Sequence, residues 1–194
     1  MSADALRITV ATDVDEETSA RYYELYRETF GELEIRAAAR QVLHEEEFLE
    51  EMHDPRVMKY LAVDADDQVI GMTTLTRDLA TVPWISPAYF AHHYPEQTER
   101  NAVYYLGFTL VRHARRQQHV FASMISVLTD LIISERAVCA WDMCHYNDEV
   151  LGLGPAISQM LASRTELDVH PIDRQTYFAA VCAGGGSAGQ DLSR

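Results

Sequence analysis

The sequence has little lysine and a shortage of positive charge. Lys59 is the single lysine among the 16 basic residues of a 194-residue chain, and the other 15 are arginines. The acidic residues number 30, which gives a formal net charge of −14. Nonspecific nucleic-acid binding needs a net basic face, so this balance argues against a nucleic-acid partner. The same balance is compatible with a cationic or amine substrate.

Cysteine is scarce as well, and long apolar runs are missing. Cys139, Cys144 and Cys182 show no metal-ligand spacing, so we expect reduced thiols and no bound metal. No apolar run approaches the roughly 20 residues that a membrane span needs. The first 20 residues lack the basic start and apolar segment of a signal peptide. We therefore expect a cytoplasmic protein without a membrane partner.

Hydrophobic periodicity predicts one domain over residues 1–181, followed by a Gly/Ser-rich tail, 182–194, that we expect to be disordered. The predicted elements are a strand at 6–11, helices at 20–33 and 35–52, hairpin strands at 57–63 and 68–76, a strand at 102–111, a helix at 120–133, a strand at 137–144, a short helix ending at 162, and closing strands at 165–170 and 176–181. A strand, helix and strand of this length imply a crossover between parallel strands.

Two stretches carry more specific expectations. In the strand at 102–111, strict alternation places Tyr105 and Gly107 on one face, and Leu106 and Phe108 on the more apolar face that should pack against the helices. An irregular insertion at 77–100 follows the hairpin, with one expected helical turn near 88–92. Long irregular segments of this kind often form lids or binding loops. Four aromatic side chains there either wall a pocket or plug the sheet: Trp84, Tyr89, Phe90 and Tyr94.

A basic turn precedes the helix predicted at 120–133. It reads Arg112-His-Ala-Arg-Arg-Gln-Gln-His119, with three arginines within five residues of an acidic chain. Free N–H groups and the helix dipole both favour an anion where a helix begins. A solvated turn is the alternative interpretation, and the charge pattern alone does not separate the two.

The order of elements over roughly residues 6–181 resembles the GNAT superfamily of acyl-CoA-dependent N-acyltransferases. Tyr60-Leu-Ala-Val-Asp64 and Gln68-Val-Ile-Gly-Met-Thr-Thr-Leu75 resemble the family's second and third strands. Cys144-His-Tyr-Asn147, followed by Val150, is similar to its strand end and Asn-x-x-Ala pattern. The insertion is similar to that of the N-acyl amino acid and acyl-homoserine lactone synthases. The resemblance implies an α/β (α+β) fold, with a central mixed sheet of about seven strands and helices on both faces.

The resemblance also implies a donor and a place for it. In this family pantetheine lies along the splayed fourth strand, and pyrophosphate rests on the N–H groups that open the next helix. The implied donor is acetyl-CoA or another acyl-CoA. The residues that would hold it are Leu110, Val111, Arg115, Arg116, Gln118, His119, Val120 and Asn147. Two signature glycines fall on His119 and Phe121, and the family's tyrosine acid falls on Gly154.

Acyl transfer to an amine needs a positioned thioester, a proton acceptor, and a donor for the leaving thiolate. Tyr105, Asp142 and His145 would line the gap between the fourth and fifth strands, with His145 as base and Tyr104 or Tyr105 as acid. A scaffold role is the alternative for each of them. A nucleophilic pair of Cys144 and His145 is disfavoured, because adjacent strand residues point to opposite faces.

Two classes of function follow from the sequence. The first is an N-acyltransferase that moves an acyl group from acyl-CoA or acyl carrier protein to a small amine or amino acid. The second is a GNAT-like fold without this activity, which binds a ligand or partner or serves another biosynthetic reaction. A homodimer would form through the insertion or the last strands.

Overall fold

Five strands form one mixed sheet in the computed structural model, which describes residues 6–112, 117–164 and 166–182. Their order in the sheet is the order of the chain: β1 (Arg7–Ala11), β2 (Val57–Val63), β3 (Val69–Thr76), β4 (Val103–Val111) and β5 (Val138–Ala140). The first four pair antiparallel, and β5 pairs parallel to β4. The α/β class and the mixed sheet are confirmed. Seven strands are not, because the described residues form five.

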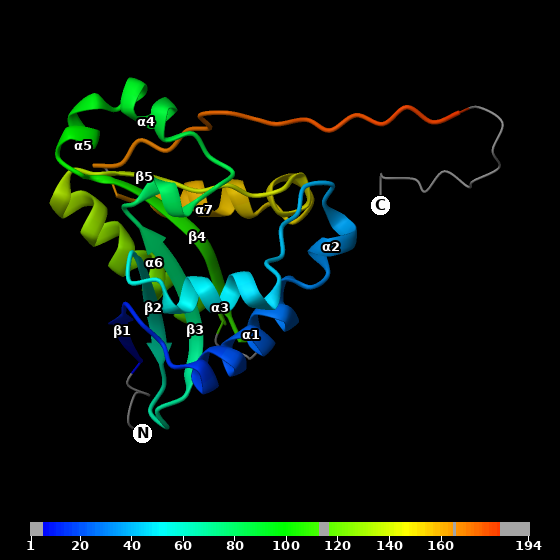
Figure 1. Ribbon diagram of the computed structural model, residues 1–194. Coiled ribbons are helices and arrows are strands. Elements are labelled where there is room, and N and C mark those ends of the chain that lie inside the picture. Colours follow the sequence, from blue (N-terminus) through cyan, green and yellow to red (C-terminus); the bar gives the residue numbers. More distant parts are fainter. Residues whose placement is uncertain (1–5, 113–116, 165, 183–194) are drawn as a thin grey trace.

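Helices cover both faces of the sheet, as expected (Figure 1). One face carries α1 (Glu16–Phe30), α2 (Leu33–Arg36) and α3 (Glu45–His53), and the other carries α6 (Gln117–Glu135). The aromatic side chains of Tyr26, Phe48 and Phe108 pack together between the first group and the sheet. Since Phe48 and Tyr26 are almost fully buried, this cluster anchors α1 and α3.

The prediction of a single helix over 35–52 was wrong, because residues 37–44 are not helical. This segment buries Val42 and lets the Leu43 backbone N–H donate to the Tyr26 hydroxyl at 3.0 Å. A new helix, α3, then begins at Glu45. The Glu47 carboxylate caps it by accepting a hydrogen bond from the His44 backbone N–H at 2.8 Å.

Helix α6 packs closely on β3 at Gly71. A Cβ atom at this position would lie 2.9 Å from Met124 Sδ and 3.1 Å from Val120 Cγ1. The strand pairing also shifts register between Ala62 and Val63. The sequence predicted a bulge or a close backbone approach at Gly71, and the structure has the close approach beside a register shift.

A β-bulge in β4 changes which residues face the helices. Thr73 pairs with Thr109 and Leu75 with Leu106, so two β4 residues lie opposite Thr74 alone. Gly107 and Phe108 consequently lie on the same face, where Phe108 joins the aromatic cluster under α1 and α3. The prediction of strict alternation was therefore wrong beyond Gly107.

The parallel pairing of β4 and β5 is confirmed but short. It covers Val103 to Tyr105 on β4 and Val138 to Ala140 on β5. β5 ends at Ala140 rather than near residue 144, whereas β4 continues to Val111. The edge of β4 from Leu106 onward is thus unpaired by β5, with α6 as the crossover between the two strands.

The insertion contains more helix than predicted: η1 (Leu79–Thr81), α4 (Pro87–His93) and α5 (Pro95–Glu99). Phe90 is buried against Val103 and Ala140, so it plugs the sheet. Trp84 is 53% exposed and remains available at the surface. Phe90 therefore acts as a plug over the sheet, whereas Trp84 is still placed to line a pocket.

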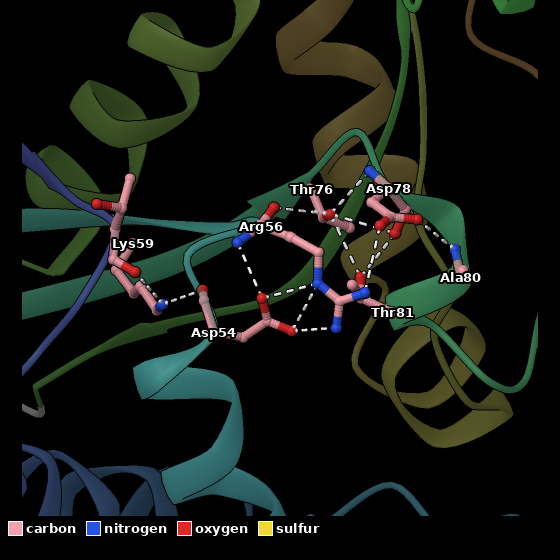
Figure 2. Close-up of polar contacts among 8 residues, drawn as sticks. Asp54, Arg56, Lys59, Thr76, Asp78, Ala80 and Thr81 are labelled. Carbon is pink, nitrogen blue, oxygen red and sulfur yellow. Dashed lines mark hydrogen bonds and ion pairs between the residues drawn. The ribbon is translucent and has the colours of Figure 1, made fainter.

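A polar network ties the insertion to β2 (Figure 2). The Arg56 guanidinium pairs with Asp54 at 2.6 Å and with Asp78 at 3.3 Å, and the Thr76 hydroxyl donates to the Arg56 carbonyl at 3.0 Å. Beside it, the buried Lys59 ammonium donates to the carbonyls of Thr12 at 2.9 Å and Asp54 at 2.8 Å. These contacts connect the end of β1, the end of α3 and the start of the insertion.

After β5 the chain forms a short π-helix, η2 (Tyr146–Val150), and then α7 (Leu153–Leu161). The closing strands predicted at 165–170 and 176–181 are wrong where they are described, because residues 166–181 form no strand. Phe178 is 93% exposed and Val181 83%, so no sheet packs on them in this chain. A homodimer through this segment stays a prediction. The tail predicted to be disordered lies outside the described residues beyond Cys182. Among the described helices, none is long and apolar enough to span a bilayer.

Candidate functional site

Three side chains meet where β4 and β5 separate. Tyr105 is the last β4 residue that pairs with β5, Asp142 follows the end of β5, and Trp84 comes from the insertion. The Tyr105 hydroxyl donates to Asp142 Oδ1. The Trp84 indole N–H lies 3.2 Å from both that carboxylate oxygen and the Tyr105 hydroxyl. The structure thus brings together two of the three residues that the sequence predicted as catalytic.

In this cluster the Tyr105 hydroxyl is fixed in place as a hydrogen-bond donor to Asp142. It is 2% exposed, and burial, followed by the charge and hydrogen bond of Asp142, raises the pKa of its hydroxyl above the ordinary value. The hydroxyl stays protonated at neutral pH, with its proton directed at Asp142. This geometry suits positioning of the carboxylate better than proton transfer, which works best with a pKa near the working pH.

A small hollow adjoins the cluster. Its free volume is about 20 Å³, enough for one water-sized group. The polar and aromatic groups that line it are Glu51, Thr74, Thr76, Thr81, Trp84 and Tyr105, and Gly107 lies among them. The hollow therefore extends from the Trp84–Tyr105–Asp142 cluster to the helix α3 face of the sheet.

Glu51 is the charged group of this hollow. Burial raises the pKa of its carboxyl, while the Thr74 hydroxyl and the charge of Lys59 act in the opposite direction. Sequence reasoning missed Glu51 because its burial depends on how α3 packs against the sheet. The available signal was its spacing, three residues after Phe48 and one before Met52, inside the apolar stripe of α3.

Thr74 is the second acceptor in the hollow. It is 1% exposed, and its hydroxyl makes no hydrogen bond of ordinary geometry within the described residues. A Cβ at Gly107 would lie 2.5 Å from this hydroxyl oxygen. A side chain at position 107 would therefore have to displace the Thr74 hydroxyl, and its absence leaves space beside Glu51 and Thr74.

His145, the predicted base, lies apart from this cluster. It is exposed, with Nδ1 3.7 Å from Glu149 Oε2 in η2. Within the described part of the chain, no hydrogen bond or ion pair joins it to Tyr105 or Asp142. The neighbouring Cys144 packs against the aromatic core, whereas His145 is exposed. The strand expected to hold both residues ends at Ala140, so the sequence argument from strand alternation does not apply to them.

The residues expected to hold an acyl-CoA fall into three groups. Leu110 and Val120 are buried in the core, and Val111 packs beside Val120, so these side chains are committed to the core. His119 is exposed in the first turn of α6, and Asn147 is half-buried in η2. Arg115 and Arg116 lie outside the described residues, as does the side chain of Gln118.

The described residues fit the pantetheine part of such a donor through the backbone of β4. From Leu106 onward its edge has no β5 partner, and peptide N–H and C=O groups on a free strand edge can pair with amide groups. Gly154 stands at the position where the GNAT superfamily has its tyrosine acid. At Gly154 the carboxylate of Asp148 occupies the space that a side chain would take.

Comparisons with known proteins give a limited picture. No protein-family model matches the chain, and no curated protein matches it significantly. Among solved structures, the chain is similar to the crystal structure of an aminoglycoside acetyltransferase from an uncultured soil metagenomic sample, in complex with sisomicin. The match covers 91% of this chain and 97% of that chain, at 11% identity and a TM-score of 0.47. A match at this level assigns neither a family nor a substrate.

Proposed function

We propose that the protein is an N-acyltransferase of the GNAT type, which moves an acyl group from a thioester donor to a small amine or amino acid. The observation that carries the proposal is the separation of β4 from β5 beyond Tyr105, with a carboxylate held at that point by Trp84 and Tyr105. The free edge of β4 supplies backbone groups for an acyl-CoA or acyl carrier protein donor. The exposed Asp142 carboxylate supplies a site for a cationic acceptor.

The proposed reaction needs mainly that the protein position the thioester and the amine. The cationic acceptor first gives one proton to water. The neutral amine then forms the C–N bond, the C–S bond breaks, and a second proton passes from the amine to the leaving sulfur. Asp142 attracts the acceptor, while Tyr105 and Trp84 hold its Oδ1 atom in one orientation, which lowers the entropic cost of alignment. The role of His145 as a base stays a prediction.

The test separates donor binding from turnover. Titration calorimetry with acetyl-CoA, longer acyl-CoAs and an acyl carrier protein measures binding, and release of free thiol with a panel of amines measures transfer. We expect saturable binding of at least one donor and thiol release that depends on the amine. Failure of every donor to bind would overturn the proposal.

A second function is supported by the departures at the helix start and in α7. His119 and Phe121 stand where the family has glycines, and Asp148 fills the space beside Gly154. These features favour a ligand-binding module that performs no acyl transfer. Donor binding without thiol release, for every amine tested, would favour this alternative.

A further inference from the structure

We propose that the hollow lined by Glu51, Thr74 and Gly107 binds a primary ammonium group, with the Glu51 carboxylate as its charge partner. The inference deepens the proposed function and rests on it in one respect, because the proposed function makes this group the amine of the acyl acceptor. Binding of an ammonium ion itself can be tested without any acyl transfer.

Two oxygen atoms converge on one point in this hollow. A Cβ built at Gly107 would lie 2.5 Å from Thr74 Oγ1 and 3.6 Å from Glu51 Oε1. The two atoms come from different elements, since Thr74 is on β3 and Glu51 is on α3. The β4 bulge opposite Thr74 brings Gly107 under both of them. A donor above Gly107 could therefore reach a hydroxyl and a carboxylate together.

The Thr74 hydroxyl and the Glu51 carboxylate both lack a full set of hydrogen-bond or ion-pair partners in the protein. The buried Thr74 hydroxyl makes no hydrogen bond of ordinary geometry among the described residues, although it is near enough to the Glu51 carboxylate to lower its pKa, and no ion pair there includes Glu51. Buried polar groups are normally hydrogen-bonded, so an unmatched pair calls for a specific explanation. An added donor group that bonds to both oxygens supplies one.

The charges around the hollow select a cation. Glu51 lines it, and Asp142 lies next to it through Tyr105. Lys59 is the cation whose charge acts on Glu51, and its ammonium group already donates to two backbone carbonyls. Asp54 adds a further negative charge near Glu51. An anionic ligand would be repelled here.

The size of the hollow selects the kind of cation. A free volume of about 20 Å³ admits one water-sized group. A primary ammonium group is of this size and presents three hydrogen-bond donors, whereas a guanidinium is a broader planar fork. Trp84 lies at the rim, where the remainder of an amine ligand would continue toward solvent.

The direct test is NMR titration of the full-length protein with methylammonium chloride, at constant ionic strength, following the Trp84 indole N–H signal. Assignment of that signal uses Trp84→Phe. We expect a saturable shift with methylammonium and none with tetramethylammonium, which has no hydrogen-bond donor. Glu51→Gln should weaken binding about tenfold or more, because it removes a charged partner of the hydrogen bond.

The matched control is Glu50→Gln, which removes the same charge from the adjacent, exposed position of α3. It should leave the affinity unchanged. Equal binding by wild type and Glu51→Gln, or no saturable shift because the hollow takes water alone, would overturn the inference. Saturable ammonium binding without acyl transfer would instead remove the proposed function. Acyl transfer with an unchanged KM for the amine in Glu51→Gln would remove only the hollow as the acceptor site.

Discussion

Tyr104 and Tyr105 are neighbours on β4 that point to opposite faces of the sheet, and each donates its hydroxyl proton to a carboxylate. Tyr104 donates to Glu135 Oε2 at 2.6 Å on the α6 side. Tyr105 donates to Asp142 Oδ1 on the side of the insertion. Both rings are buried, and burial is the main cause of the raised pKa of each hydroxyl. By residue type and local bonding the two sites are alike.

The difference is the charge around each carboxylate. Glu135 also accepts from Arg77 at 2.8 Å, and the Arg77 guanidinium lies 4.7 Å from the centre of the Tyr104 ring. Asp142 receives N–H and O–H donors, but within the described residues it pairs with no cation. A matched carboxylate stabilises the fold, whereas an unmatched and exposed one can still attract a positive ligand. We therefore infer that Tyr104 is scaffold and that Tyr105 belongs to the functional site.

The largest expected effect is on turnover. Asp142→Asn should lower kcat/KM for acyl transfer by about a hundredfold, because the neutral amide no longer attracts or orients the amine. Glu135→Gln makes the same chemical change at the scaffold site and should leave kcat/KM almost unchanged. Steady-state thiol release with both variants provides the measurement. An equal loss in Glu135→Gln would erase the distinction between the two tyrosines.

The next largest effect is on stability, and here the scaffold residue Tyr104 should matter more than Tyr105. Tyr104→Phe should lower the free energy of unfolding by about 1–2 kcal/mol, because it leaves a hydrogen-bonded carboxylate short of one partner. Tyr105→Phe should cost less, since Asp142 is exposed and water can replace the lost donor. Urea unfolding followed by circular dichroism measures both. A larger loss in Tyr105→Phe would identify that cluster as the structural one.

How far the sequence predicts the structure depends on how local the signal is. The β2–β3 hairpin and α6 were predicted within a few residues, because alternation and helical spacing are written into each segment. The bulge at Gly107 and Phe108 was not, since register depends on the partner strand. The strands expected near 176–181 failed for a related reason: β-branched and aromatic residues favour a strand, but pairing needs a neighbour.

The site shows the same division. Tyr105 and Asp142 were predicted from the divergence of the two strands, which the resemblance to the GNAT superfamily implies. Glu51 was missed because burial of a charge inside an acidic run is a tertiary effect. The hydrogen bond from Trp84 was also missed, because a long insertion gives no sequence signal for where one aromatic side chain will lie.

A smaller contrast separates two adjacent threonines of β3. Thr73 donates to the Phe108 carbonyl at 2.8 Å and bonds to the Thr109 hydroxyl at 2.7 Å, whereas the Thr74 hydroxyl has no such partner in the described residues. Thr73→Val should cost about 1 kcal/mol of unfolding free energy, and Thr74→Val should be neutral or stabilising. Chemical denaturation measures both variants. A destabilising Thr74→Val would mean that its hydroxyl is already bonded in the free protein, which removes one basis for the ammonium site.

The smallest expected effect is a pH dependence of opposite sign for two glutamates. In the folded protein the pKa of Glu135 lies below its ordinary value of 4.5, and that of Glu51 lies above it. Ionised Glu135 therefore adds stability above pH 4.5, and this is lost as the pH falls through its lowered pKa. Ionised Glu51 costs stability above its raised pKa, and that cost disappears as the pH falls toward 4.5. At pH 7 Glu135→Gln should thus destabilise the protein and Glu51→Gln should stabilise it, and both differences should shrink in acid. Thermal unfolding from pH 7 to pH 3 measures this pair, and a destabilised Glu51→Gln at pH 7 would show that Glu51 is already matched by a partner in the free protein.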